Sequence, residues 1–268
     1  MITTTELEAL AKQYRRDLFE KFVLVRQGHP GSTFSMIDIV VALYHGGFIR
    51  FDSDQKKFVD RVLISKGHAT VALYPILARF GVLPQFEWDA WGKSPSVLRV
   101  FGNTSIPGID VTSGSLGHGV GVGAGMALAS KRSGGDKRVF VVISEGELYE
   151  GSTWEALLFA AHYNLSNLTV VIDINSLIIL GSTKDCVALN PILDKIAGFG
   201  LEARECDGHN FPSIMSALSS PTTSLGPRIV LANTIKGKGC SIMENKAKWH
   251  YWNPMTVEQI EQCRKELA

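Results

Sequence analysis

Residues 138–182 read RVFVVISEGELYEGSTWEALLFAAHYNLSNLTVVIDINSLIILGS, and this stretch carries the clearest structural pattern in the chain. Residues 139–143 are a short, continuous apolar run, which is typical of a strand buried on both faces. A serine, a glutamate and a glycine follow, and residues 147–163 then show apolar side chains at helical spacing. Residues 168–174 are a second apolar run. The stretch is therefore predicted to fold as strand, loop, helix, strand and loop.

The two loops of this unit are expected to meet at one edge of a parallel sheet. The carboxyl ends of parallel strands lie together, and open α/β folds bind their ligands there. Glu145 follows the first strand and Asn175 follows the second, so they can lie side by side although they are far apart in the sequence. A carboxylate and an amide oxygen next to a helix N-terminus suit Mg²⁺ or Ca²⁺ that bridges to a phosphate.

The rest of the chain predicts an α/β fold with a mainly parallel sheet sandwiched by helices, because strands and helices alternate. With 268 residues, 45% of them hydrophobic, the chain has ample material for a core, and residues 1–268 are expected to form a single domain. Further helices are expected at residues 5–27, 34–44, 69–80, 116–130, 191–198, 212–218 and 255–268, and further strands at 61–65, 201–205 and 228–232.

Composition excludes several classes of function. A net charge of +1 gives no reason to expect nucleic acid or an acidic membrane surface as a partner. No apolar run approaches the ~18 residues of a membrane span and the N-terminus lacks a signal-like apolar region, so a cytoplasmic location is expected. The four cysteines lack C-x-x-C spacing, and neither a zinc site nor a disulfide framework is predicted.

The glycine-rich segment 116–130 contains a formal G-x-G-x-x-A match. A dinucleotide site is not favoured, because no convincing strand precedes the segment and no acidic residue ends the next strand. Gly117, Gly121 and Gly125 lie four apart on one helical face. Each interior glycine costs a helix ~1 kcal/mol relative to alanine. This helix is therefore expected to need tertiary or inter-subunit contacts.

Two histidines stand out by their neighbours. Isolated histidines are more often structural than functional, but His29 and His68 both lie beside glycines, where a backbone can approach a ligand closely. Histidine is also the usual acid, base or phosphate donor near neutral pH. The later stretch 236–239, Lys-Gly-Lys-Gly, is similar to a phosphate-binding nest but lacks the Walker pattern, so a nucleotide triphosphatase is not favoured.

Several of these segments, in the same order, resemble those of transketolases. Residues 144–175 are similar to the family's thiamin diphosphate motif, which begins Gly-Asp-Gly-Glu and closes with Asn. Residues 28–31 (GHPG), 65–68 (SKGH), 112–119 (TSGSLGHG) and 236–250 match other family motifs. The resemblance runs from about Leu7 to the C-terminus, but it covers only the diphosphate-binding half of a transketolase.

By this resemblance the chain is the N-terminal subunit of a split, two-chain transketolase that binds thiamin diphosphate and Mg²⁺ (or Ca²⁺). The metal is expected at Glu145, the Asn175 side chain and the Leu177 carbonyl. Catalytic roles are implied for His29 and His250, which would steady substrate oxygens, and for Glu150, which in the family pairs with a partner carboxylate at the subunit interface. Cofactor contacts are implied for His68, Gly114, Leu116, Glu145, Gly146, Glu147, Asn175 and His250.

The resemblance also implies a partner. In the family a glutamate on a second, pyrimidine-binding domain activates the cofactor, and this chain ends before such a domain. A C-terminal transketolase subunit carrying that catalytic glutamate is therefore expected, in an α2β2 heterotetramer. The implied reaction moves a two-carbon ketol unit from a ketose or ketose phosphate to an aldose, and departures from the family pattern favour a specialised biosynthetic pathway.

Those departures keep two alternatives open. Ser144 and Glu145 stand where the family has Gly and Asp, and Asn103 lies where it usually carries a His-Pro pair. The chain could belong to another thiamin diphosphate enzyme, similar to deoxyxylulose-phosphate synthase or to a 2-oxo-acid dehydrogenase alpha subunit. It could also be a degenerate, non-catalytic scaffold subunit. Residues 147–151 and 236–239 favour transketolase over the other enzymes.

Overall fold

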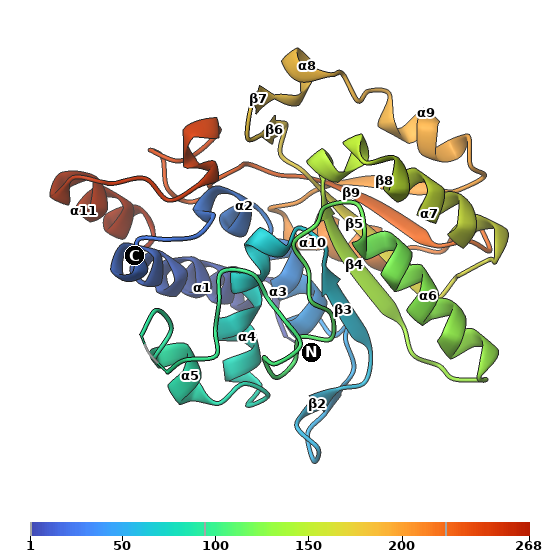
Figure 1. Ribbon diagram of the computed structural model, residues 1–268, viewed down its shortest axis with the longest axis horizontal. Helices are drawn as coiled ribbons and strands as arrows, with labels where there is room; N and C mark the ends of the chain where they lie inside the picture. The colour runs from blue at the N-terminus through green and yellow to red at the C-terminus, as the bar shows by residue number, and fades with distance from the viewer. Residues whose placement is uncertain (1, 94, 223) are drawn as a thin grey trace.

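The computed structural model describes residues 2–93, 95–222 and 224–268. At its centre lies a five-stranded parallel sheet in the order β3-β4-β5-β9-β8 (Figure 1). Its strands are β3 (Arg61–Ile64), β4 (Val139–Ser144), β5 (Leu168–Ile174), β8 (Ala203–Asp207) and β9 (Arg228–Asn233). The predicted parallel α/β sheet is therefore confirmed.

Helices cover both faces of this sheet, and alternate residues of each strand divide between them. Phe140 and Val142 of β4 pack with α1 (Thr4–Val25), α3 (Ile37–His45) and α10 (Phe211–Ser219). Val141 and Ile143 pack on the opposite face with α6 (Gly119–Arg132), α7 (Gly151–His162) and α9 (Ile192–Ala197). Figure 1 shows α6 and α7 together on one side of the sheet, away from α1 and α3. The continuous apolar strands follow from this burial on two sides.

Smaller elements complete the chain, and most lie in the connections. They are α2 (Pro30–Ser35), β1 (Phe51–Asp52), β2 (Lys57–Phe58), η1 (Gly67–Leu73), α4 (Tyr74–Arg79), α5 (Gln85–Asp89), η2 (Glu145–Tyr149), β6 (Leu177–Ile178), β7 (Gly181–Ser182), α8 (Thr183–Cys186), η3 (Ala247–His250) and α11 (Val257–Glu266). No helix in the described residues is long and apolar enough to cross a membrane.

The predicted helix at 147–163 differs in its first turns. Residues 145–149 form a 3-10 turn, Glu150 is extended, and the α-helix begins only at Gly151. The Ser144 and Glu147 side chains cap this turn reciprocally. Because Glu147 also accepts hydrogen bonds from distant Ser65 and Gly117, its conformation depends on contacts that local spacing does not show.

The prediction that the cysteines form no disulfide was wrong. Cys240 and Cys263 are bonded, with Cα atoms 5.2 Å apart, and both side chains are fully buried. The bond joins the loop after Lys236 to helix α11. Spacing alone could not predict it, because the two cysteines meet only when α11 docks on that loop.

Candidate cofactor site

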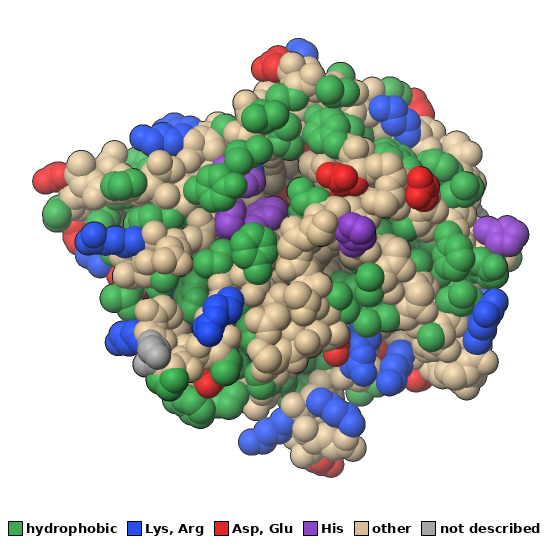
Figure 2. Space-filling model, viewed as in Figure 1, with side chains coloured by type: hydrophobic (Ala, Val, Ile, Leu, Met, Phe, Trp, Pro, Cys, Tyr) green, Lys and Arg blue, Asp and Glu red, His purple; other side chains and the backbone are tan. Residues whose placement is uncertain are grey.

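Three histidines from distant segments converge. His29 immediately precedes α2, His68 lies in η1 and His250 ends η3. The ring centroid of His29 lies 4.9 Å from that of His68 and 5.4 Å from that of His250, and the latter two are 5.4 Å apart. Figure 2 shows histidine side chains gathered at the edge of a hollow on this face. The structure thus brings together three residues that the sequence singled out.

These imidazoles are neutral near neutral pH. Burial, with the nearby Lys236 cation second, lowers the pKa of His29 to about 4 and the pKa of His250 to about 3. Burial also holds the pKa of His68 well below its usual value. The buried Nδ1 of His29 has no hydrogen-bond partner among the described residues. Leaving such a group unpaired costs about 1–3 kcal/mol, so this atom points to a ligand.

Two buried lysines lie next to the histidines. Lys66 donates to the Asp173 carboxylate and, at 2.9 Å, to the carbonyl of Ser32. Lys236 Nζ lies 3.3 Å from both the Leu177 carbonyl oxygen and His250 Nδ1. Burial, reinforced by Lys66, lowers the pKa of Lys236 to about 8. Sequence reasoning gave neither lysine a role, although both lie inside the SKGH and KGKG motifs.

Asp173, at the end of β5, balances part of this positive charge. Its carboxylate accepts hydrogen bonds from Lys66, Ser35 and Thr234. Burial opposes its ionisation, but the Lys66 cation and these donors hold the pKa of Asp173 below its usual range. Sequence reasoning missed this residue because it lies inside the apolar strand run, where an acid carries no local signal.

The predicted metal ligands lie at adjoining strand ends, because Ser144 of β4 pairs in register with Asp173 of β5. The Glu145 carboxylate accepts hydrogen bonds of 2.7 Å from the Ser176 amide and from the Thr183 hydroxyl. Asn175 Oδ1 accepts one of 3.3 Å from the Leu177 amide. The predicted oxygens thus share one corner of the fold, and protein donors already contact each of them.

The donor set fits a diphosphate. Two buried ammonium groups and three neutral imidazoles lie in one region of the molecule and offer several N–H donors, which suits an anion with many oxygens. Carboxylate, amide and carbonyl oxygens at the adjoining corner suit Mg²⁺. A metal at the Leu177 carbonyl would have to displace the Lys236 contact or share that oxygen with it, since the carbonyl has two lone pairs.

Two predicted glutamates have different surroundings. Glu147 is fully buried, and its carboxylate accepts hydrogen bonds from the Ser65 hydroxyl and from the Gly117 and Ser144 amides at 3.1 and 3.0 Å. Burial raises the pKa of Glu147. Its contacts are thus with protein groups that hold η2 against the start of α6. Glu150 is exposed and lies against Gly117, where a Cβ would come within 2.5 Å of the Glu150 Cβ.

The remaining predicted contacts lie in the segment before α6 and in η2. Gly114 is exposed and Leu116 half-buried in the segment that leads into α6, and Gly146 lies in η2, where a Cβ would come 3.2 Å from Ile178.

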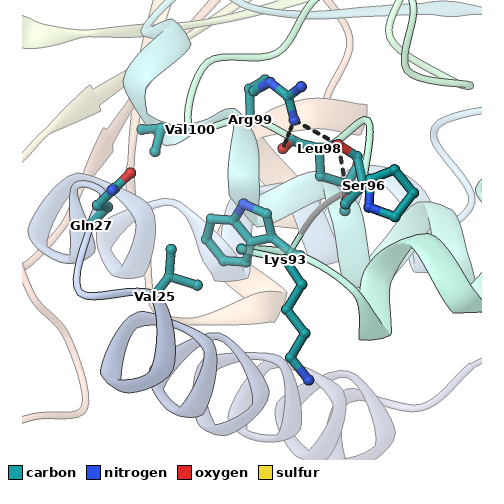
Figure 3. Close-up of a pocket in the computed structure, with 10 residues that line it drawn as sticks. Val25, Gln27, Lys93, Ser96, Leu98, Arg99 and Val100 are labelled. Atoms are coloured by element: carbon teal, nitrogen blue, oxygen red, sulfur yellow. Dashed lines mark hydrogen bonds between the residues drawn. The ribbon is translucent and has the colours of Figure 1, made fainter.

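Two of the cavities among the described residues lie near the elements discussed here, outside the histidine cluster. Figure 3 shows one of about 520 Å³ between the end of α1 and residues 91–100. There the Arg99 guanidinium donates to the Ser96 and Leu98 carbonyl oxygens, which stabilises a turn. The other, of about 830 Å³, lies at the carboxyl ends of β5, β8 and β9 and touches Glu145.

Comparisons with a family model and with individual proteins point to the same family. Residues 9–268 match the family described as transketolase, thiamine diphosphate binding domain. The chain is 36% identical to an apulose-4-phosphate transketolase subunit of Actinobacillus succinogenes, covering 98% of this chain and 96% of that one. It is 34% identical to the 6-deoxy-6-sulfo-D-fructose transketolase subunit SqwG of a Clostridium species, covering 91% and 90%.

Full-length transketolases match over less than half of their length. The human enzyme is 32% identical over 97% of this chain but only 42% of its own. The crystal structure of the Campylobacter jejuni transketolase superposes with a TM-score of 0.90 at 24% identity, covering 99% of this chain and 43% of that one, which supports the fold. The chain therefore belongs to the transketolase family of transferases, as a thiamine diphosphate binding domain that corresponds over nearly its whole length to one subunit of the members that are divided between chains.

Proposed function

We propose that this chain binds thiamin diphosphate with Mg²⁺ and, together with a C-terminal partner subunit, transfers a two-carbon ketol unit from a ketose or ketose phosphate to an aldehyde acceptor. The observation that carries the proposal is the convergence of His29, His68 and His250 with the buried Lys66 and Lys236. Burying two cations is costly unless anions compensate them; Asp173 forms an ion pair with Lys66, whereas Lys236 has no carboxylate in direct contact among the described residues.

In this proposal His68 and Lys236 hold the diphosphate, while Glu145, the Asn175 amide oxygen and the Leu177 carbonyl hold the metal. When bound, thiamin diphosphate supplies the electron sink that lets the ketose carbon–carbon bond break. In this proposal His29, whose Nδ1 has no partner among the described residues, hydrogen-bonds a substrate oxygen. A neutral imidazole there stabilises negative charge as it develops on that oxygen.

The partner subunit is proposed to cover the outer face of α6 and α7. Gly121 and Gly125 are exposed, and a Cβ added at Gly125 would meet nothing within 4 Å. Val122, Leu158 and Phe159 are 40%, 55% and 40% exposed around them. Exposed glycines allow close approach of another backbone, and a contiguous apolar face marks an interface. Glu150 lies at the edge of this face, where a partner carboxylate could reach it. An α2β2 assembly is proposed.

Calorimetry tests the cofactor proposal directly. The complex with its partner should bind thiamin diphosphate in a Mg²⁺-dependent manner and then turn over ketose phosphates. No binding at millimolar cofactor would favour the scaffold alternative, which the departures at Ser144, Glu145 and Asn103 motivate. Turnover of pyruvate alone would instead assign the chain to another thiamin diphosphate enzyme.

A further inference from the structure

The β6–β7 hairpin is tied to the end of β4 by the side chain of Glu145. The Glu145 carboxylate accepts hydrogen bonds of 2.7 Å from the Ser176 amide, where the hairpin begins, and from the Thr183 hydroxyl, where it ends. The Leu177 carbonyl, a proposed metal ligand, lies between these two points in the chain. Glu145 therefore holds both ends of a segment that carries another ligand of the proposed metal site.

Thr183 is held by three hydrogen bonds. Its amide donates to the Ser176 carbonyl oxygen at 3.1 Å, and its own carbonyl oxygen accepts from the Tyr149 hydroxyl at 3.2 Å. Its hydroxyl donates to Glu145. Thr183 and Glu145 are only 6% and 5% exposed. The contact between this hydroxyl and this carboxylate is therefore buried and formed by residues of this chain alone.

The start of the hairpin needs such a restraint. Ser176 has a φ of 60°, in the left-handed region, which is unfavourable for a residue with a side chain. The hydrogen bond from its amide to Glu145 helps to hold this conformation. A Cβ at Gly146 would come 3.2 Å from the Ile178 side chain, so the hairpin packs directly against the turn that begins at Glu145. The position of the Glu145 carboxylate and the conformation of the hairpin are thus coupled.

Open space beside Glu145 makes the Thr183 hydroxyl important. The cavity of about 830 Å³ is lined by Glu145, Ser176, Ser182 and Thr183 among other residues. Fixing a long, flexible side chain such as glutamate costs conformational entropy. Without the hydroxyl, the carboxylate keeps only its bond from the Ser176 amide and can turn toward the cavity. Mg²⁺ demands near-ideal octahedral geometry, so its carboxylate ligand has to be held in place.

We propose, on the basis of the function proposed above, that Thr183 is a positioning residue for the metal site, whose hydroxyl fixes the Glu145 carboxylate for Mg²⁺ without contacting the ion. A carboxylate oxygen that accepts one hydrogen bond keeps a further lone pair, so these contacts leave Glu145 able to bind a metal. Removing a group that orients a metal ligand typically lowers metal affinity 10–100-fold.

The test measures thiamin diphosphate binding to the assembled complex by calorimetry over a range of Mg²⁺ concentrations. Thr183→Val keeps the shape of the side chain but removes the donor, and it should raise the Mg²⁺ concentration needed for half-maximal binding about 10–100-fold. Thr183→Ser keeps the hydroxyl and should behave like the wild type. Ser182→Ala is the matched control, because Ser182 lines the same cavity but its hydroxyl accepts from the Lys184 amide.

Two further measurements separate positioning from general structural damage. Ca²⁺ tolerates a less regular ligand geometry than Mg²⁺, so Thr183→Val should impair binding with Ca²⁺ less than binding with Mg²⁺. Glu145→Asp shortens the side chain by one methylene and takes its carboxylate out of reach of the Thr183 hydroxyl. Thr183→Val should therefore have no effect on Mg²⁺ dependence in the Glu145→Asp background, which a double-mutant cycle measures.

An unchanged Mg²⁺ dependence in Thr183→Val would overturn the inference. Equal losses with Mg²⁺ and Ca²⁺, or the same loss in both backgrounds, would also overturn it, because Thr183 would then have a structural role only. Denaturant unfolding checks that each variant folds, and Thr183→Ala tests the same contact if Thr183→Val does not. A wild-type complex that binds no thiamin diphosphate in the presence of Mg²⁺ would instead overturn the proposed function itself.

Discussion

Replacing Lys236 with methionine should weaken cofactor binding without destabilising the protein. Lys236 is 2% exposed, and the pKa of its ammonium is lowered from 10.5 to about 8. At about 1.36 kcal/mol per pKa unit, holding this charge costs the folded protein about 3 kcal/mol. The folded pKa lies below the unfolded one, so the whole cost is present below pH 8 and it disappears as pH rises from 8 to 10.5.

Methionine of similar length removes this cost but leaves the Leu177 carbonyl without its donor, which costs about 1–3 kcal/mol. The free energy of unfolding at pH 7 should therefore stay the same or rise by up to about 2 kcal/mol. The affinity for the cofactor should instead fall, because the cofactor phosphate loses a charged hydrogen-bond donor. A hydrogen bond to a charged group contributes about 1.5–3 kcal/mol, which corresponds to roughly 10–150-fold in Kd.

Two measurements decide the point: denaturant unfolding of the chain at pH 7, and calorimetric titration of the complex with thiamin diphosphate. Lys238→Met is the matched control, because that side chain is 35% exposed, and its 4.0 Å ion pair with the 32% exposed Glu244 side chain is open to solvent and contributes little. Unchanged affinity in Lys236→Met would refute the role of Lys236. A loss of stability of several kcal/mol would refute the burial argument.

Four further outcomes are expected. Glu145→Ala should abolish Mg²⁺-dependent cofactor binding, whereas Glu145→Asp should retain it; wild-type Mg²⁺ dependence in the alanine variant would exclude Glu145 from the metal site. Cofactor affinity should fall as pH rises above about 8, because Lys236 then loses its charge. In Lys236→Met the affinity, measured by calorimetric titration, should change less with pH. Asp60 is fully buried between Arg50 and Arg138, and its hydrogen bonds outweigh the effect of burial and hold its pKa below 3.8. Asp60→Asn should cost about 2–4 kcal/mol in urea unfolding at pH 7. The stability that ionised Asp60 contributes is present above pH 3.8 and is lost as the pH falls toward its lower pKa in the folded protein. A difference in unfolding free energy between wild type and Asp60→Asn that stays constant down to pH 2 would therefore contradict this assignment. Cys263→Ser should lower the unfolding free energy by about 3 kcal/mol under oxidising conditions, since the bond closes a loop of 23 residues, and equal stability with and without reductant in the wild type would argue against the bond.

The β4–α7–β5 unit could be predicted from the sequence alone. Its strands were expected at 139–143 and 168–174 and lie at Val139–Ser144 and Leu168–Ile174. A strand buried on both faces has a continuous run of apolar residues, and such a run can be recognised within a few residues of sequence. His29 and His68 were identified for a similar reason, because the glycines beside them are visible in the sequence.

The composition of the site beyond these residues depends on tertiary structure. Asp173 meets Lys66 only when the segment after β3 reaches the end of β5, and Lys236 meets His250 only because the loop after β9 folds back toward β6. The Cys240–Cys263 bond and the ring contacts of Phe101 and Tyr251 with His29 likewise join segments far apart in the chain. The spacing of apolar residues and the residue types that favour turns determine structure over only a few consecutive residues. These pairings arise instead from helix docking and loop closure, which no stretch of sequence encodes by itself.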